Sequence, residues 1–192
     1  PILMKVDPLI KVKADGLIAE PIVIWVNEFT EASAKEFATN MSKAHSTGQP
    51  VIPIYIDSYG GEAHAVLAMI SEIEHAKIPV ATIVLGKAMS CGAILFSFGT
   101  EGYRYCDENA IVMIHQVSAM KWGKLEELKS RVKYTENMNQ HIYKKMSLNC
   151  KQDPNFMANE MSKRNNADWF LDAKECKKIK LANHIGVPHF TA

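Results

Sequence analysis

The sequence predicts an α/β domain in which helices cover a mostly parallel sheet, and three observations support this. Short, almost wholly apolar segments alternate along the chain with longer segments of helical periodicity. The apolar segments lack the strict in-and-out alternation of a half-exposed sheet, which is typical of strands buried on both faces. Glycine and proline residues separate the two kinds of segment. Strands that alternate with helices indicate a parallel α/β architecture.

Four strands are expected, with a helix after each of the first three. Thr30 is expected to cap the first helix, because Phe37 and Met41 then fall at helical spacing. Trp25, inside the first strand, is expected in the core. The expected strands are residues 21–26, 51–56, 79–85 and 111–114.

A long helix is expected over residues 124–148, because this polar stretch contains neither proline nor glycine. It is too long for the compact part of the domain to cover, which indicates packing against another subunit. Beyond it, Asp153 and Pro154 are expected as the N-cap and first residue of a further helix. Asp172 and Glu175 have the spacing of a capping box.

The composition is that of a globular protein with one domain, residues 1–192. Hydrophobic residues make up 47% of the chain and charged residues 22%, and the formal net charge is +1. This balance gives no reason to expect nucleic acid or a membrane surface as the main partner. The first residues lack the apolar stretch of a signal peptide, and no apolar run reaches about 18 residues, so no membrane span is expected.

The cysteines predict free, reduced thiols and a cytoplasmic location. No two of them form a C-x-x-C pair, so the spacing of a metal site is absent. A disulfide framework is not expected in a chain of this length. The four cysteines are Cys91, Cys106, Cys150 and Cys176.

Ser90 and His115 are the first candidates for chemistry. Ser90 follows a strand and a turn of small residues and begins a helix, where the helix N-terminus favours negative charge. A serine hydroxyl needs an adjacent base to act as a nucleophile, and His115 stands at the end of the fourth strand, where parallel sheets carry functional groups. Taken alone, Ser90 is better explained as an ordinary helix cap and His115 as a structural residue.

Paired glycines, Gly60 and Gly61, follow the second expected strand. Glycine allows a sharp turn and leaves its N–H accessible to a ligand oxygen. A plain turn is the better explanation of an isolated pair, so the pair gains meaning only from its neighbours.

Four segments together resemble the proteolytic subunits of the Clp protease family, chambered peptidases that work with ATP-driven unfoldases. They occur in the order of the family pattern, and His115 lies 25 positions after Ser90, as in that pattern. The resemblance extends more weakly over residues 22–185. The matching segments are residues 54–61, 83–93, 99–104 and 112–116.

The resemblance implies a Clp protease/crotonase-like fold with repeated β-β-α-type units, a parallel sheet covered by helices, and a protruding handle helix over residues 124–148. Residues 1–20 would form an N-terminal segment, with an axial loop as one interpretation. Ser90, His115 and Asp168 would form the catalytic triad, with Asp168 preferred to Asp172, which a capping role already explains. The backbone N–H groups of Gly61 and Cys91 would form the oxyanion hole.

The resemblance also implies an activity and partners. The chain would be a serine endopeptidase subunit of a cytoplasmic homo-oligomer, a heptameric ring stacked on a second ring, and would cleave unfolded polypeptides delivered by an ATP-dependent unfoldase. No metal or organic cofactor is needed. Three alternatives stay open: a phage head-maturation-type serine protease, a crotonase-type acyl-CoA hydratase or isomerase, and a non-catalytic ring subunit.

Departures from the family pattern indicate a divergent member, either phage-borne or a secondary paralogue. Asp57 and Tyr59 replace the usual asparagine and proline, and residues 117–123 replace a glycine-rich strand. Within that segment, Met120 and Trp122 are expected to pack rather than to narrow the cleft. Asn166 and Ala167 replace a charged pair, so weaker coupling between stacked rings is expected.

Overall fold

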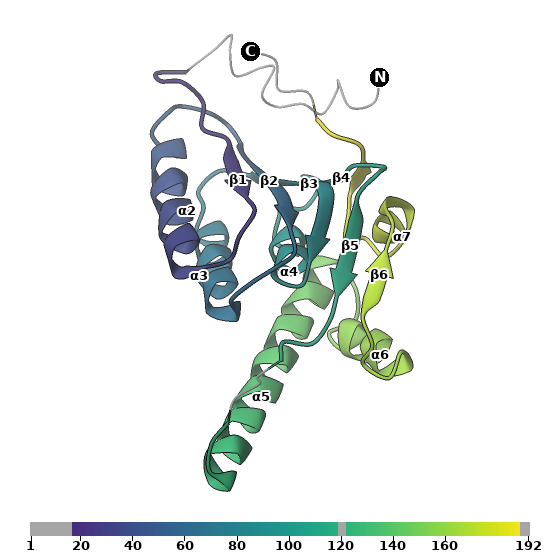
Figure 1. Cartoon of the computed structure of the whole chain (residues 1–192). Helices are drawn as coiled ribbons and strands as arrows, with labels where there is room; N and C mark the ends of the chain where they lie inside the picture. The colour runs from purple at the N-terminus through teal and green to yellow at the C-terminus, as the bar shows by residue number, and fades with distance from the viewer. Residues whose placement is uncertain (1–16, 119–121, 189–192) are drawn as a thin grey trace.

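The computed structural model describes residues 17–118 and 122–188 and contains one sheet flanked by helices (Figure 1). The expected N-terminal segment therefore lies largely outside the described residues, as does Met120. The strands are β1 (Ile24–Val26), β2 (Ile52–Ser58), β3 (Val80–Met89), β4 (Arg104–Cys106), β5 (Ile111–Ile114), β6 (Trp169–Leu171) and β7 (His184–Ile185). The helices are α2 (Glu31–Ala44), α3 (Ala63–Glu74), α4 (Cys91–Ser97), α5 (Leu125–Asn149), α6 (Phe156–Lys163) and α7 (Ala173–Lys178).

The sheet is mostly parallel, which confirms the predicted fold class. Its main path runs β1-β2-β3-β4-β7, and β5 pairs in parallel with the second half of β3. The long strand β3 changes its partner at Gly86, pairing with β4 before it and with β5 after it. A parallel sheet gathers the carboxyl ends of its strands at one edge. The residues that follow β3 and β5 therefore lie near each other.

The four expected strands are confirmed, the fourth with its predicted bounds and the first three with shifted ones, and three short strands were not predicted. The third strand does not stop at Gly86 as expected, because it continues to Met89 along β5. Among the unpredicted strands, β6 is antiparallel to β5 and the only antiparallel strand in the described part of the sheet. The β4–β5–α5 run has the order of a β-β-α unit, whereas β1, β2 and β3 each lead into one helix.

Two predicted helix starts are confirmed and one is wrong. Thr30 caps α2 in a reciprocal box with Ser33, and the Asp172 carboxylate caps α7 by accepting from the Glu175 N–H. The helix expected from Asp153 begins instead at Phe156. Residues 153–156 form a turn instead of the first helical turn, in which the Asp153 carbonyl accepts a hydrogen bond from the Phe156 N–H at 2.9 Å. Aspartate and proline at the first two turn positions favour this arrangement.

Both tryptophans that were expected to pack are exposed. Trp25 is 63% exposed because β1 is an edge strand and its outward side chain stacks on Tyr55 of β2, with ring centroids 4.8 Å apart. Trp122 is fully exposed. Neither side chain contributes to the core, which contains the opposite side of β1 through Ile24 and Val26.

The long helix α5 extends away from the sheet (Figure 1), as predicted. Its C-terminal part packs on the core through buried residues, whereas Leu125, Val132 and Tyr134 nearer its start are exposed. One cluster of buried residues extends from Ile24 to Ala182, so the described residues share a main core. The single-domain assignment of residues 1–192 stays a prediction.

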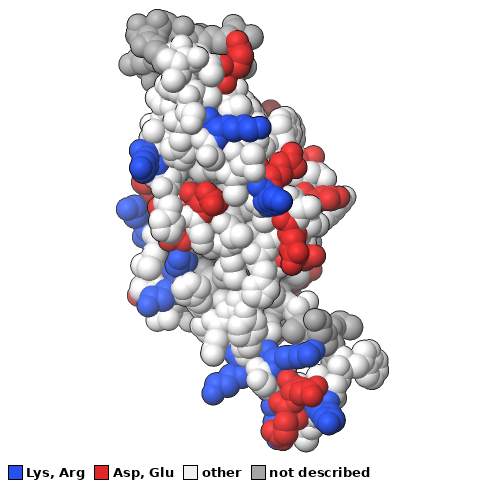
Figure 2. Space-filling view, turned by 90° about the vertical axis from the view of Figure 1, so that its left-hand side faces the viewer, with Lys and Arg blue, Asp and Glu red and all other residues white. Residues whose placement is uncertain are grey.

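Charges of both signs are interspersed on the face that carries α2 and α3 (Figure 2). This distribution agrees with the near-neutral balance of 22 Lys and Arg against 21 Asp and Glu. Within the described residues, no helix has the length and apolar character needed to cross a membrane.

Candidate active site

Ser90 occupies a strained position between β3 and α4. Its backbone angles are φ 56° and ψ −116°, a region that favours glycine and that other residues adopt at a cost of roughly 1–3 kcal/mol. The Ser90 N–H donates to the Met113 carbonyl at 2.9 Å, so the bend is fixed against the end of β5. In the described structure its hydroxyl makes no capping hydrogen bond to α4, so the helix-cap alternative is not supported. A serine held this way at a strand-to-helix turn has the geometry of a nucleophile elbow.

The glycine pair lies directly against this bend. Gly60 and Gly61 have φ angles of 109° and 154°. A Cβ at Gly60 would lie 2.9 Å from the Cβ of Ser90, and one at Gly61 would lie 2.5 Å from the Phe29 carbonyl oxygen. Glycine is therefore required at both positions for conformation and for close approach. The plain-turn alternative does not account for this contact with Ser90.

Cys91, the residue after Ser90, contacts the same loop. Its thiol donates to the Gly61 carbonyl at 3.5 Å, and the carbonyl oxygen of Glu62 lies 3.7 Å from the sulfur. The thiol is buried, and desolvation raises its pKa, so it is held as a neutral donor. As the first residue of α4, Cys91 has an N–H that precedes the helical hydrogen-bond pattern. The two residues expected to form the oxyanion hole are thus in contact.

His115 and Asp168 lie opposite each other at the end of the β5–β6 pair. Ile114 pairs with Trp169 in the antiparallel register, so the residues beyond them, His115 and Asp168, face each other. The Asp168 Oδ1 atom is 3.7 Å from Nδ1 of His115, which is ion-pair range but longer than a hydrogen bond. The rival Asp172 is engaged in capping α7, where its Oδ1 accepts from the Glu175 N–H at 2.8 Å.

Ser90 and His115 line a common cavity whose far wall is the handle helix. The cavity measures about 10 Å³, room for roughly one water molecule. Ile142, Tyr143 and Met146 of α5 form its apolar side. Within the described residues no hydrogen bond joins the Ser90 hydroxyl to the His115 ring. The structure therefore gathers the three expected triad residues at one edge of the sheet. In the described residues, neither the Ser90–His115 pair nor the His115–Asp168 pair is within hydrogen-bonding geometry.

Sequence reasoning missed the contribution of the handle helix to this site. The Tyr143 hydroxyl is buried without a hydrogen-bond partner among the described residues, and burial raises its pKa to about 12. One signal was present, because Asn139 and Tyr143 are four residues apart, as are Ile142 and Met146, and such residues share a helix face. That spacing marks the buried face of α5 but does not show what it contacts.

Asn139 on the same face fixes the segment that follows His115. Its Oδ1 accepts from the Val117 N–H at 2.8 Å, and its Nδ2 donates to the Val117 carbonyl at 3.1 Å. Asn139 is buried, so both bonds are shielded from water. A larger hollow of about 380 Å³ adjoins this clamp and is also lined by Gln116, Glu136 and Asn166.

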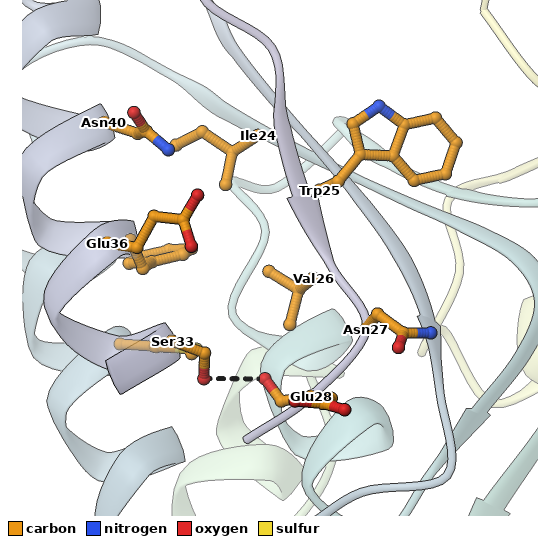
Figure 3. A pocket seen from close by; sticks show the side chains of 10 residues that line it. Ile24, Trp25, Val26, Asn27, Glu28, Ser33, Glu36 and Asn40 are labelled. Carbon is orange, nitrogen blue, oxygen red and sulfur yellow. Dashed lines mark hydrogen bonds between the residues drawn. The ribbon is translucent and has the colours of Figure 1, made fainter. Parts of the chain in front are cut away.

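A separate hollow of about 240 Å³ lies between β1 and α2 (Figure 3). Its polar lining includes Glu28, Glu36 and Asn40, and the Ser33 hydroxyl in its wall donates to the Glu28 carbonyl at 2.8 Å. Because Ser33 is engaged in the cap of α2 and no histidine lines this hollow, it does not bring a free hydroxyl together with a histidine, as the cavity lined by Ser90 and His115 does. Across residues 17–118 and 122–188 no cluster of three or more His, Cys, Asp or Glu could hold a metal ion.

Two comparisons with known proteins show what the chain is similar to. A family model described as Clp protease matches residues 10–189 of the chain. The ATP-dependent Clp protease proteolytic subunit 1 of Rhodopirellula baltica is 28% identical over 176 residues, which cover 89% of this chain and 74% of that protein.

Proposed function

The chain belongs to the Clp protease family, and from this premise we propose that it is a serine endopeptidase whose nucleophile is Ser90. The observation that carries the proposal is the strained Ser90 bend, which adjoins both the paired glycines and the cavity that His115 lines. A glycine-like backbone at a non-glycine residue is costly, and such strain clusters at active sites.

In the proposed reaction, Ser90 Oγ attacks a peptide carbonyl and His115 takes the hydroxyl proton. Asp168, facing Nδ1 of His115, holds the ring tautomer and stabilises the imidazolium. The N–H groups of Gly61 and Cys91 bind the oxyanion. His115 then returns the proton to the leaving amine, and water hydrolyses the acyl-enzyme by the same proton path. These steps require no metal or organic cofactor.

The assembly and partners are proposed on the same premise. We infer rings of seven subunits, stacked in pairs, that receive unfolded polypeptides from an ATP-driven unfoldase in the cytoplasm. The exposed apolar residues of α5, Leu125 and Val132, support burial of the handle against another copy. Asn166 and Ala167 offer no charge for coupling between rings. Native mass spectrometry tests this, since a monomer at assay concentration would contradict the ring.

A fluorophosphonate probe tests the catalytic proposal. Such probes phosphonylate an activated serine, so the labelled peptide identified by mass spectrometry should contain Ser90, and Ser90→Ala should remove both labelling and peptide hydrolysis. Labelling at another serine, or hydrolysis that survives in a folded Ser90→Ala protein, would overturn the assignment. Acyl-CoA turnover that survives this substitution would favour the crotonase-type alternative.

One observation favours a second candidate, a ring subunit that supports an active partner without cleaving. Asp168 lies beyond hydrogen-bond distance from His115 in the single chain. The probe distinguishes the two, because a non-catalytic subunit would assemble into rings yet stay unlabelled. A head-maturation-type protease would be labelled too, but would cleave one defined partner rather than unfolded chains in general.

A further inference from the structure

Lys87 contacts both of the residues by which the loop at the glycine pair departs from the family pattern. We infer that Lys87 is a positioning residue that holds the oxyanion loop, defined here as residues 57–61, in its working geometry. The inference rests on the proposed serine peptidase function. It concerns a side chain three residues before Ser90 on β3 that takes no part in the proton transfers.

Two contacts made by one ammonium group carry the inference. Lys87 Nζ lies 2.7 Å from Oδ1 of Asp57 and 4.4 Å from the centre of the Tyr59 ring. The lysine thus bridges the two side chains that flank the buried Ser58. The hydrogen bond to Asp57 raises the pKa of Lys87, so the group carries its charge throughout the neutral range.

The strand geometry is adapted to this bridge. The β2–β3 register shifts between Ile56 and Ser58, at Asp57 itself. Across from it Gly86 has a φ of 65°, and a Cβ there would lie 2.9 Å from Oδ1 of Asp57. A side chain at position 86 would therefore crowd the carboxylate that Lys87 binds. Backbone irregularity on both strands accommodates one ion pair.

The bridge acts where the oxyanion loop leaves β2, directly after Ser58, which pairs with Ala88 of β3. At the far end, Gly61 is held by Phe29 and by the Cys91 thiol. At the near end, Asn27 Nδ2 donates to the Asp57 carbonyl at 2.7 Å, but Tyr59 is 76% exposed and has no proline ring to restrict its backbone. The Gly60 N–H donates to the Ser58 hydroxyl at 3.0 Å, so a displacement of residues 57–59 would be passed to the glycines.

The expected effect is on catalysis more than on folding. Lys87 and Asp57 are partly exposed, and such ion pairs contribute little to stability. Oxyanion stabilisation, by contrast, depends on donors fixed at the right distance, and small displacements of a reacting group slow the chemical step strongly. The substitution Lys87→Met keeps the aliphatic stem and removes the charge, while Lys87→Arg keeps the charge.

The experiment compares wild type, Lys87→Met and Lys87→Arg on the best substrate from a library of short fluorogenic peptides, together with a peptide boronate that mimics the tetrahedral intermediate. We expect Lys87→Met to lower kcat on the order of tenfold, with KM within about twofold, and to weaken boronate binding by the same factor. Lys87→Arg should recover most of the loss. Asp57→Asn should resemble Lys87→Met, and the double substitution should be no worse than either.

Lys145→Met is the matched control. Lys145 also joins two elements through an ion pair, 2.8 Å from Glu74, and lies 5.9 Å from the Phe98 ring centre, but it contacts no residue of the oxyanion loop. An unchanged kcat in Lys87→Met, an equal loss in Lys145→Met, or a loss explained by a changed oligomer on native mass spectrometry would overturn the inference. If the wild type neither hydrolyses peptides nor reacts with the fluorophosphonate, the proposed function itself fails.

Discussion

The carboxylate of Asp168 faces the ring of His115 across the end of the β5–β6 pair, 3.7 Å from Oδ1 to Nδ1. The antiparallel register produces this relationship, because Ile114 and Trp169 are partners and His115 and Asp168 are the next residues outward. Both side chains are partly exposed, Asp168 by 54%. A closer approach, within hydrogen-bond distance, is needed for Asp168 to orient the imidazole.

The first prediction separates the two aspartates. Asp168→Asn should lower kcat by roughly three to four orders of magnitude, because the amide favours the wrong imidazole tautomer. Asp172→Ala should leave kcat near wild type and lower the free energy of unfolding by about 1 kcal/mol, because it removes the cap of α7. Steady-state kinetics and denaturant unfolding at equal protein concentration measure both. The reverse pattern would transfer the third triad role to Asp172.

The second prediction concerns the strain at Ser90. Ser90→Ala and Ser90→Gly should both abolish hydrolysis. The free energy of unfolding of the glycine variant should nevertheless be about 1 kcal/mol higher than that of the alanine variant. The reason is that glycine adopts φ 56° and ψ −116° without steric cost, and this gain exceeds its extra chain entropy in the unfolded state. Alanine keeps the strain and removes only the hydroxyl.

Thermal or denaturant unfolding of the two variants, at matched protomer concentration, decides this second prediction. The alanine variant is itself the control for loss of the hydroxyl. Equal stabilities, or a less stable glycine variant, would show that the Ser90 backbone is not strained in solution.

The third prediction concerns the clamp between the handle helix and the segment after His115. Asn139→Leu keeps most of the volume but leaves the Val117 N–H and carbonyl without their partners, at a cost of about 1–3 kcal/mol. Hydrogen exchange at the Val117 amide should accelerate, and kcat should fall because His115 is held less firmly. Asn137→Leu, the same substitution at an exposed position two residues earlier on α5, is the control and should change neither quantity. Unchanged exchange at Val117 would mean that the clamp does not persist in solution.

Some of this site could be predicted from the sequence, and physical reasons explain the rest. Ser90 and His115 follow apolar strands, so the local pattern marked them as candidates, and the family resemblance then gave them their roles. The strand β6 that aligns Asp168 has three residues, with Phe170 exposed, and is too short for a periodic signal. Asp168 was therefore identified only by the family resemblance.

Contacts between side chains distant in the chain were likewise invisible in the sequence. Lys87 and Asp57 are separated by 30 residues and meet only because β2 and β3 pair in a shifted register. Trp25 was misassigned for a related reason, since an apolar strand gives no sign of whether it is at the edge of the sheet. Its exposure depends on which strands flank it and which face the helices cover.

The last prediction concerns what the enzyme can reach. The chain has no G-x-x-x-x-G-K-[ST] segment, so it lacks the phosphate-binding loop by which many ATPases hold their nucleotide. Unfolding a stable substrate requires about 5–15 kcal/mol, and a peptidase alone has no source of that energy. If Ser90 faces a closed chamber, the purified protein should cleave short peptides without ATP but leave a tagged, stably folded protein intact.

Addition of a matching unfoldase with ATP should then make the folded protein degradable, whereas a non-hydrolysable ATP analogue should not. A gel time course under these conditions gives the answer, and a chemically unfolded form of the same substrate is the control for access by diffusion. A ring opening admits an extended chain, so that unfolded form should be degraded without the unfoldase. Its degradation should be slow, because the chain enters by diffusion alone. Rapid digestion of the folded substrate by the peptidase alone would show that Ser90 is open to solvent, and the chambered assembly would have to be abandoned.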